Sequence, residues 1–581
     1  MNELKYISYS DSRADFLITT QDNEQIRTTL IKLGANEIKK SGYTVYVWDS
    51  RLGDRFLSGL GVLDSQFYLG PRRIHFLPSN YGAGNYVFVD LSDHTALVQP
   101  DLFGMSMVYI SDGFISNRLH LLALIIKKIN TSLALSSTYD NGGFSFSLNT
   151  FDTPIDGVKI LPAGARAKII NGQIKIEQTY LKSDFQEKSP TEYWALIRKG
   201  AQEVIDNVTA ILDSGLPVIA DLSGGRDSRI VFGALIASGR IKDVIFNTIS
   251  NPSSPGLIAD LNIASGLVKY YGGSYHNRPI PIGYSLYTPE QNMIKRRSQV
   301  FGTYHWITPS DIQPIHSLST VPAIRMLGGG GELYREYWRP MLFNTADSST
   351  ASSNDYLLEL LYKFKDKRFG NEFFPYYIDY LLETFQKLPG ETIGHKFDAH
   401  YLNFRNRFHF GQRQSIAESM YILNVATTPS LLEASRSLPL NEQATGRVIF
   451  DVIRCLDDKL AYFEFDSPTN EKIFHSSYHL PRKNNNVMAV SPAPEIVQNI
   501  NDFRSFQRAI KPANIEYDFN ALLDKEIDNS IQILQRNQTE FSFLVNDDLH
   551  NLISWAKEHS PRNRSALASK LRAFADYSLF K

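Results

Sequence analysis

A short loop that combines glycines, serines and an aspartate is the part of this sequence best suited to chemistry. It occupies residues 222–228 and reads LSGGRDS. Adjacent glycines let a backbone approach phosphate oxygens closely, and backbone N–H groups at the start of a helix favour an anion. Ser223 and Ser228 add hydroxyl donors, and Asp227 supplies a carboxylate that Mg²⁺ could share with phosphate oxygens. These residue types at this spacing predict a phosphate-binding loop with a metal ligand.

The residues on either side predict the elements that hold this loop. An apolar run at 216–221 is typical of a buried strand, and the amphipathic stretch 229–238 predicts a helix. A second pair follows, with a strand expected at 244–249 and a helix at 256–271. Strand, glycine turn, helix, strand and helix in this order are typical of a parallel α/β sheet.

Better-known phosphate motifs do not fit the loop. It has no lysine for a P-loop, and it lacks the G-x-G-x-x-G spacing of a dinucleotide site. The pattern S-G-G-x-D-S is instead the signature of ATP pyrophosphatases, which cleave ATP between its α- and β-phosphates. The alternative is a serine-glycine turn that caps a helix, with Asp227 as an ordinary acid of the first turn.

Length and composition set the class of protein. With 581 residues, 43% hydrophobic and 21% charged, the chain is expected to be globular with two domains. Sixty basic against 61 acidic residues argue against nucleic-acid or membrane-surface partners that require a global basic field. A single cysteine, Cys455, excludes an intramolecular disulfide. The first 14 residues lack a signal-peptide core, and no apolar run reaches membrane length, so we expect a cytoplasmic protein.

The pattern changes along the chain suggest where the two domains meet. Residues 43–180 consist of short β-branched and aromatic runs separated by turn residues, including 86–90 and 98–110, and read mostly as strand. A polar segment at 182–192 that contains Pro190 predicts a linker before a helix that begins near Thr191. Residues from about 355 onward read as largely helical, with few strand candidates. We therefore expect domains at 1–185 and 186–581.

Further segments resemble one family. With the 223–228 motif, the chain is similar to asparagine synthetase and its relatives, which include β-lactam synthetases and lasso-peptide cyclases. The similar segments are DLNIA at 260–264 with YG at 271–272, GGGGELY at 328–334, and, in the first domain, QPDLFG at 99–104, SN at 116–117 and LPAG at 161–164. The resemblance spans nearly the whole chain. It implies an α/β protein with an N-terminal β-rich, glutaminase-like (Ntn-type) domain, then an adenine-nucleotide α-hydrolase-like parallel-sheet domain with a helical tail.

The resemblance also implies the activity, a carbon–nitrogen ligase that uses ATP and Mg²⁺. A carboxylate would attack the α-phosphorus, pyrophosphate would leave, and an amine or ammonia would take the acyl group from the adenylate. Residues implied to hold the triphosphate are Ser223, Gly224, Gly225, Asp227 and Ser228. Those implied near the adenine or beside the nucleotide are Leu222, Thr248, Ile249 and Gly328. The carboxylate is open among aspartate, a sugar acid and a peptide, as is ring closure. The sequence is also compatible with a homo-oligomer or a pathway partner.

Two departures from the family pattern alter these expectations. Position 2 is Asn2 where the family's glutamine-hydrolysing members expose a cysteine, so we expect no hydrolysis of glutamine by this chain. In the later glycine loop, Gly331 stands where the family has an aspartate, which leaves Glu332 as the expected second magnesium ligand and catalytic acid. The alternative for Glu332 is an acid at a helix start, stabilised by the helix dipole.

A third departure concerns a late lysine that neutralises charge on the family's intermediate. Phe465 lies near the matching position, and Lys459 and Lys472 are the nearest substitutes, although each could be an ordinary solvated side chain. The amine-activating acid–base pair of ring-closing relatives is not visible in the glycine run. Adenylation is thus better supported than acyl transfer, and the alternative function is a catalytically degenerate nucleotide-binding regulatory or assembly protein.

The sequence also contains a cluster of basic residues at 405–413. Arg405, Arg407, His409 and Arg413 stand close together, and arginine side chains suit phosphate or carboxylate. The cluster could bind pyrophosphate or an anionic acceptor, or it could be a charged helical face with pairs four residues apart. The 13 histidines show no zinc-binding spacing.

Overall fold

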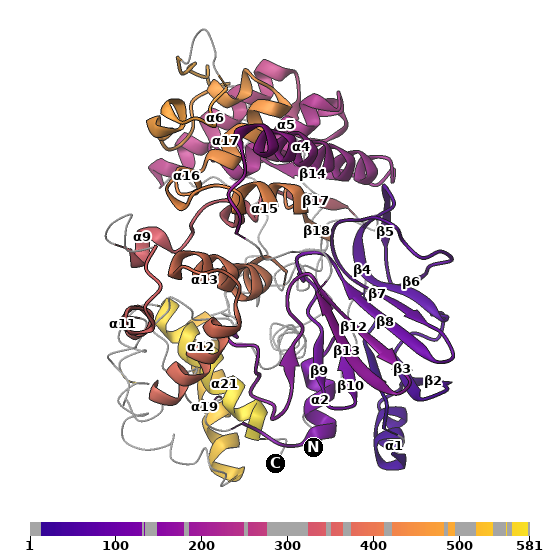
Figure 1. The fold of residues 1–581 in the computed structure, drawn as a ribbon. Coiled ribbons are helices and arrows are strands. Elements are labelled where there is room, and N and C mark those ends of the chain that lie inside the picture. Colours follow the sequence, from indigo (N-terminus) through magenta and orange to yellow (C-terminus); the bar gives the residue numbers. More distant parts are fainter. Residues whose placement is uncertain are drawn as a thin grey trace.

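The computed structural model describes residues 13–21, 23–130, 133, 148–178, 185–248, 254–275, 323–343, 350–363, 374–411, 421–480, 486–493, 519–537, 554 and 561–578. In this part of the chain the fold is mixed α/β, with two antiparallel sheets and one parallel sheet (Figure 1). None of the described helices is both long and apolar enough to cross a membrane.

The two antiparallel sheets are formed by the N-terminal residues. The first has the spatial order β11 (Lys159–Ile160), β9 (Tyr109–Ser111), β10 (Phe114–Ser116), β1 (Phe16–Thr19), β3 (Tyr43–Val47) and β2 (Asn36–Lys40). The second has the order β13 (Gln173–Gln178), β12 (Ala165–Ile170), β8 (Thr95–Pro100), β7 (Tyr81–Leu91), β4 (Arg55–Leu63) and β5 (Gln66–Leu69), and β6 (Arg72–Arg73) pairs with β4.

Alternating side chains determine how these sheets are layered. On β1, Phe16 and Ile18 share a buried cluster with Val87 of β7, so the two sheets pack face to face. Leu17 points the other way, into a second cluster that covers the first sheet with α1 (Glu24–Lys32) and α2 (Leu119–Ile126). Phe88, next to Val87, belongs to the largest cluster, which includes the buried face of α4 (Pro190–Leu212). The order of layers is therefore helices, sheet, sheet, helix.

The strand prediction for residues 98–110 is wrong in its middle part. The structure has β8 end at Pro100 and β9 begin at Tyr109. Between them the buried carboxylate of Asp101 accepts hydrogen bonds from the backbone N–H groups of Met105 at 2.9 Å and Ser106 at 2.8 Å. A side chain that satisfies these N–H groups takes the place of a strand partner and folds the segment into a turn.

The parallel sheet has the order β16 (Ser274–Tyr275), β15 (Ile245–Asn247), β14 (Val218–Asp221), β17 (Ile324–Leu327) and β18 (Tyr421–Asn424). Helix α5 (Arg226–Ala237) follows β14, and α6 (Pro255–Tyr271) follows β15, which confirms the predicted alternation. The described residues from about 355 onward are largely helical, as predicted, and strand β18, for which no position was predicted, pairs with β17 along its whole length. Its side of the sheet is thus completed by residues far along the chain.

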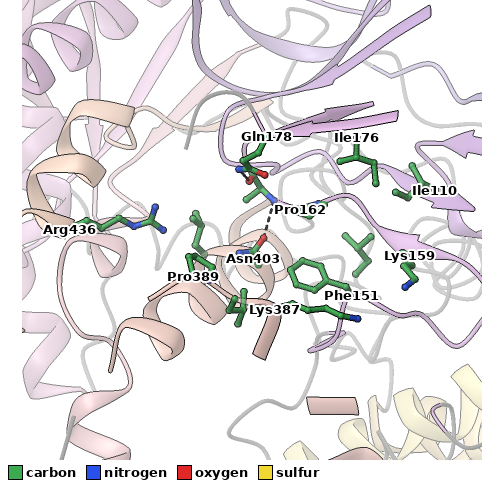
Figure 2. A pocket seen from close by; sticks show the side chains of 14 residues that line it. Ile110, Phe151, Lys159, Pro162, Ile176, Gln178, Lys387, Pro389, Asn403 and Arg436 are labelled. Atoms are coloured by element: carbon green, nitrogen blue, oxygen red, sulfur yellow. Dashed lines mark hydrogen bonds between the residues drawn. The ribbon is translucent and has the colours of Figure 1, made fainter. Parts of the chain in front are cut away.

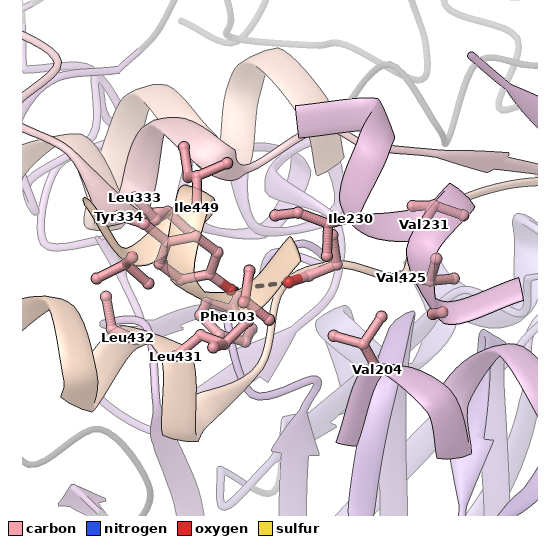
Figure 3. Packing of buried hydrophobic residues seen from close by; sticks show 14 of the residues in the cluster. Phe103, Val204, Ile230, Val231, Leu333, Tyr334, Val425, Leu431, Leu432 and Ile449 are labelled. Atoms are coloured by element: carbon pink, nitrogen blue, oxygen red, sulfur yellow. Dashed lines mark hydrogen bonds between the residues drawn. The ribbon is translucent and has the colours of Figure 1, made fainter. Parts of the chain in front are cut away.

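Helix α4 begins one residue before the position predicted near Thr191, at Pro190. Ser189 forms a capping box with Glu192. The serine side chain accepts a hydrogen bond from the backbone N–H of Glu192, and the glutamate side chain accepts one from the backbone N–H of Ser189. The buried cluster in Figure 3 joins Phe103 of the N-terminal part to Val204 of α4 and Ile230 of α5. The apolar core is therefore continuous across residue 185.

The remaining elements of the described chain are mostly helical and surround the parallel sheet and the N-terminal sheets. They are η2 (Ile241–Asp243), η3 (Gly331–Tyr334), α9 (Arg339–Leu342), α11 (Asn354–Tyr362), α12 (Phe374–Lys387), α13 (Ile393–His400), the π-helical turns η4 (Tyr401–Arg405) and η5 (Arg407–Gly411), α15 (Pro429–Arg436), α16 (Leu440–Gln443), α17 (Arg447–Leu456), η6 (Leu460–Tyr462), η7 (Glu471–His475), α19 (Phe519–Asn537) and α21 (Pro561–Ser578).

Candidate functional site

The predicted phosphate loop lies between β14 and the first turn of α5. Its serines close the loop on itself, since the N–H of Ser223 donates to Oγ of Ser228 at 3.1 Å and the N–H of Gly225 donates to Oγ of Ser223 at 3.0 Å. The N–H of Gly224 donates to a carboxylate oxygen of Asp260 on α6 at 2.9 Å. The loop thus already holds one anionic acceptor, and burial raises the pKa of Asp260. A phosphate oxygen is the same kind of acceptor.

Gly328 lies against this loop at the end of β17. A Cβ atom on Gly328 would be only 2.4 Å from the backbone N and Cα of Ser228. Backbone atoms cannot move aside as a flexible side chain can, so the second glycine loop reaches the start of α5 only because residue 328 is glycine. Ser228 and Gly328, each expected to lie by the nucleotide, are therefore next to each other.

Asp227 and Glu332 are the acids at the junction of the two glycine loops. Within the described chain, Oδ1 of Asp227 and Oε2 of Glu332 are buried without a hydrogen-bond partner. Burial first, and then the charge of Glu332, raise the pKa of Asp227 to about 7. Oδ2 of Asp227 lies 3.6 Å from Nη2 of Arg335, whose charge acts in the opposite direction. Two carboxylates with unused oxygens are an arrangement that a divalent cation stabilises.

This pair fits Mg²⁺ better than it fits a metal held by the protein alone. No group of three or more histidine, cysteine or acidic residues suited to a metal occurs in the part of the chain that the structure describes. Mg²⁺ commonly takes one or two carboxylates and completes its octahedron with phosphate oxygens and water. Asp227 and Glu332 would be those carboxylates, and the remaining positions would be open to a polyphosphate.

Gly331 leaves room for the carboxylate of Asp227. A Cβ on Gly331 would lie 2.3 Å from Oδ1 of Asp227. The carboxylate of Asp227 occupies the space in which a side chain at 331 would begin. After burial, the acid next along the chain, Glu332, contributes most to the raised pKa of Asp227, ahead of Asp466.

Phe465, at the position matched to the late lysine, is covered by a buried arginine. The guanidinium of Arg229 lies 3.7 Å from the centre of the Phe465 ring and donates to the carbonyls of Phe463 at 2.9 Å and Glu464 at 2.6 Å. Burial lowers the pKa of Arg229 to about 9. Because its N–H groups are engaged by backbone carbonyls, Arg229 fixes the 463–465 segment against α5.

Arg226 supplies a second cation at the same place. It occupies the variable position of the S-G-G-x-D-S motif, and its guanidinium lies 5.6 Å from the centre of the Phe465 ring. Its Nη2 donates to the carbonyl of Pro468 at 2.5 Å, whereas its Nε is buried with no hydrogen-bond partner among the described residues. The predicted substitutes Lys459 and Lys472 are both exposed at the surface. Arg226 is thus better placed than either lysine to meet a phosphate at the loop.

The residues expected near the adenine are only partly described. Thr248 donates through its hydroxyl to the carbonyl of Leu222 at 2.7 Å and contacts the hydroxyl of Tyr275 at 2.8 Å. Leu222 and Thr248 are both buried, and the hydrogen bond between them joins the ends of β14 and β15. Ile249 lies outside the described residues.

The predicted basic cluster is divided by the structure. Arg405 lies 5.7 Å from the centre of the Tyr337 ring, which is 4.6 Å from the ring of Tyr401. After burial, the charge of Glu332 contributes most to raising the pKa of Tyr401 well above its usual value, which places η4 close to the acids. His409 is exposed, and Arg413 lies outside the described residues. One arginine of the cluster, Arg405, therefore faces the candidate site.

Arg407 is buried and has a different role. Its Nε donates to the carbonyl of Gly104 at 2.6 Å, and its Nη1 donates to the carbonyl of Leu161 at 2.9 Å. Both carbonyls belong to segments of the N-terminal part, 99–104 and 161–164, for which the sequence predicts a place in the first domain. Asn117, from a third such segment, accepts from the N–H of Phe16 at 2.9 Å and so fixes the start of β1. Asn2 lies outside the described residues.

Sequence reasoning assigned no role to Asp260, Arg226 or Arg335. Arg226 and Arg335 carry weak signals, because each is a basic residue close in sequence to a predicted metal ligand. Asp260 carries none of that kind, since its contact with Gly224 joins residues 36 positions apart. Comparisons with protein-family models and with curated proteins give no match to this chain.

Proposed function

We propose that this chain is an ATP-dependent ligase related to asparagine synthetase, which adenylates a carboxylate and transfers the acyl group to an amine or ammonia. The observation that carries the proposal is the pair Asp227 and Glu332, each of which has a buried oxygen without a hydrogen-bond partner among the described residues. A catalytically degenerate nucleotide-binding protein is the second candidate. Gly331 and Phe465, where the resemblance implies an aspartate and a lysine, favour that candidate.

Several groups at the loop would contribute to the first half-reaction. A substrate carboxylate oxygen forms a bond to the α-phosphorus of ATP, the bond from that phosphorus to the bridging oxygen breaks, and pyrophosphate leaves. Mg²⁺ supplies charge neutralisation when bound. The loop N–H groups, the start of α5 and the guanidinium of Arg226 favour the negative charge that develops on pyrophosphate. Arg335, which in this structure lies 3.6 Å from Asp227, is close enough to add a further cation.

The second half-reaction would complete the ligase. The amine nitrogen attacks the acyl carbon of the adenylate, AMP leaves, and the nitrogen loses a proton. Tyr401, Tyr337 and Arg405 border the acids on the side of η4, and we assign the acceptor to that side. An arginine beside two aromatic rings suits a planar or anionic acceptor.

The N-terminal part would serve as a scaffold. The layer order of helices, sheet, sheet and helix in this region supports a glutaminase-type domain over 1–185, joined to a nucleotide domain over 186–581. In the proposed reaction the nitrogen donor is ammonia or an amine, which the ligase takes directly.

Pyrophosphate exchange into ATP, measured with a panel of carboxylic acids, tests the proposal. The assay uses the full chain with Mg²⁺, with and without ammonia and a panel of amines. We expect exchange with at least one acid, and a loss of about 100-fold or more in Asp227→Asn. Asp243→Asn is the matched control, because Asp243 is 46% exposed and pairs with Arg240 away from the loop.

Three outcomes separate the possibilities. Exchange that depends on Mg²⁺ and on Asp227 supports the ligase. Release of ADP and phosphate contradicts it, because cleavage would then occur at the γ-phosphate. Binding of Mg-ATP without exchange under every acid and amine condition favours the degenerate nucleotide-binding protein.

A further inference from the structure

A cavity of about 610 Å³ lies between the N-terminal sheets and the helical segments that include the end of α12 and η4 (Figure 2). We call it the sheet–helix cavity. Its wall is formed by residues of β9, β11 and β13, by the end of α12 and the two residues after it, by η4, and by the end of α15. Small-molecule sites in proteins typically have volumes of roughly 300–1,000 Å³ and often lie between packed units. The size and position are therefore those of a ligand site.

The wall is mainly apolar. Ile160, Leu388 and Leu402 are buried side chains of the lining, and Phe151 adds a partly buried ring. The side chain of Asn403 already has hydrogen-bond partners, because it accepts from the N–H of Ala163 at 3.0 Å and donates to the carbonyl of Ala399 at 2.9 Å. An apolar molecular body would replace water on this surface favourably.

Among the described residues of the lining, every ionisable side chain is basic. These residues are Lys159, Lys387 and Arg436. In Figure 2, Arg436 approaches from one side, and the two lysines lie on the opposite side near Phe151. Arg436 is 6% exposed, and its guanidinium lies 5.1 Å from the centre of the Phe185 ring. Burial lowers the pKa of Arg436 to about 10, so its charge persists at neutral pH.

The acids behind this wall leave its positive character in place. Asp398 is the acid that most affects Arg436, but burial and the charge of Glu336 raise the pKa of Asp398 well above its usual value. A raised pKa weakens the negative charge that Asp398 sets against the guanidinium. Lys159 pairs with Asp152 and Lys387 with Glu383, and these lysines are 51% and 47% exposed. Exposed ion pairs contribute only about 0–1 kcal/mol and exchange readily.

We propose that the sheet–helix cavity is a second ligand site, which binds an amphipathic organic anion. Its apolar body lies on Phe151, Leu388 and Leu402, and its carboxylate or phosphate group faces Arg436. The site is separate from the phosphate loop, because Tyr401 of η4 faces Glu332 whereas Leu402 and Asn403 line the cavity. It does not depend on the proposed ligase activity.

The first test uses anilinonaphthalene sulfonate, an aromatic body with one fixed negative charge. Fluorescence titration of the full chain should give saturable one-to-one binding. Ile176→Trp should weaken it tenfold or more, because Ile176 lines the cavity and is 51% exposed, so a larger ring fills the space without disturbing the core. Ile31→Trp, at an equally exposed isoleucine (44%) on α1, should leave binding unchanged.

The second test examines charge. Arg436→Gln should weaken binding tenfold or more and Lys387→Gln severalfold, whereas Lys175→Gln, at an exposed lysine of β13 outside the lining, should have no effect. Naphthoate and naphthyl phosphate should displace the probe, and the tighter competitor identifies the preferred head group. Neutral naphthylmethanol should not displace it.

Clear results would overturn the proposal. They are the absence of saturable binding, unchanged affinity in Ile176→Trp, or equal displacement by the neutral alcohol. If Arg436→Gln does not fold, as judged by thermal unfolding, Ile176→Trp and Lys387→Gln decide the question, because both positions are exposed.

Discussion

Gly331 and Asp227 are in such close contact that a Cβ atom on the glycine would lie 2.3 Å from Oδ1 of the aspartate. The two glycine loops are therefore not independent motifs. The second loop determines where the carboxylate of the first can be, and Glu332 follows at the next residue. An aspartate at 331 would place a third acid in this space.

Gly331→Ala should move the carboxylate of Asp227 and weaken Mg-ATP binding by about tenfold or more, because the methyl group overlaps a predicted metal ligand. Isothermal titration with Mg-ATP measures this effect. Gly256→Ala is the control, since a Cβ there meets nothing within 4 Å and the residue lies in α6. It should bind normally and unfold at the same or a slightly higher temperature.

Arg226→Met should distinguish the phosphates of ATP. If Arg226 meets the β- or γ-phosphate, the variant should bind ATP about tenfold more weakly while its affinity for AMP changes less than twofold. Arg226→Lys should recover part of the loss, since it keeps the charge. Arg240→Met, at the far end of α5, serves as control. Equal losses for ATP and AMP would show that Arg226 only supports the loop.

Arg407→Met should destabilise the whole chain, by on the order of 3 kcal/mol or more. The substitution removes the donors to the carbonyls of Gly104 and Leu161, which lie in the N-terminal part. Urea unfolding measures the change. Arg51→Met is the control. Arg51 is 79% exposed, so its substitution should lower the free energy of unfolding by less than about 0.5 kcal/mol.

Asp451→Asn should change how stability depends on pH. Burial raises the pKa of Asp451 to about 7, whereas the unfolded chain releases that proton near pH 3.9. Between these values the folded chain binds more protons, so the contribution of Asp451 to stability falls as the pH rises. The variant keeps an acceptor for Tyr193, whose hydroxyl lies 2.9 Å from Asp451.

Thermal unfolding of both forms checks this prediction. The free energy of unfolding of Asp451→Asn, relative to that of the native chain, should increase from pH 5 to about pH 7 and level off above it. The total increase should be a few kcal/mol, at about 1.36 kcal/mol per pKa unit. A difference that is constant across this range would contradict the raised pKa.

Local patterns were sufficient for the elements around the first glycine loop. The apolar run before it and the amphipathic stretch after it predict β14 and α5, and both exist. Strand β18 was missed because four residues, Tyr421–Asn424, carry little pattern by themselves and become a strand only through pairing with β17. Tertiary pairing of this kind overrides local propensity.

The candidate site was predictable to a similar extent. Asp227 and Glu332 came from motif and resemblance, and the structure brings them together with unused oxygens. The separate roles of Arg405 and Arg407 could not be predicted, because two residues in one helical turn face different partners. The carbonyl that Arg407 reaches at Gly104 is 303 positions away in sequence.

The anchoring of Arg229 has a consequence for how the protein is made. The carbonyl of Glu464 that receives its guanidinium emerges from the ribosome 235 residues later. A nascent chain that already contains all of LSGGRDS has neither this acceptor nor strands β17 and β18. The motif is thus complete long before the proposed site exists, and any binding that needs the whole site must wait until most of the polypeptide has been synthesised.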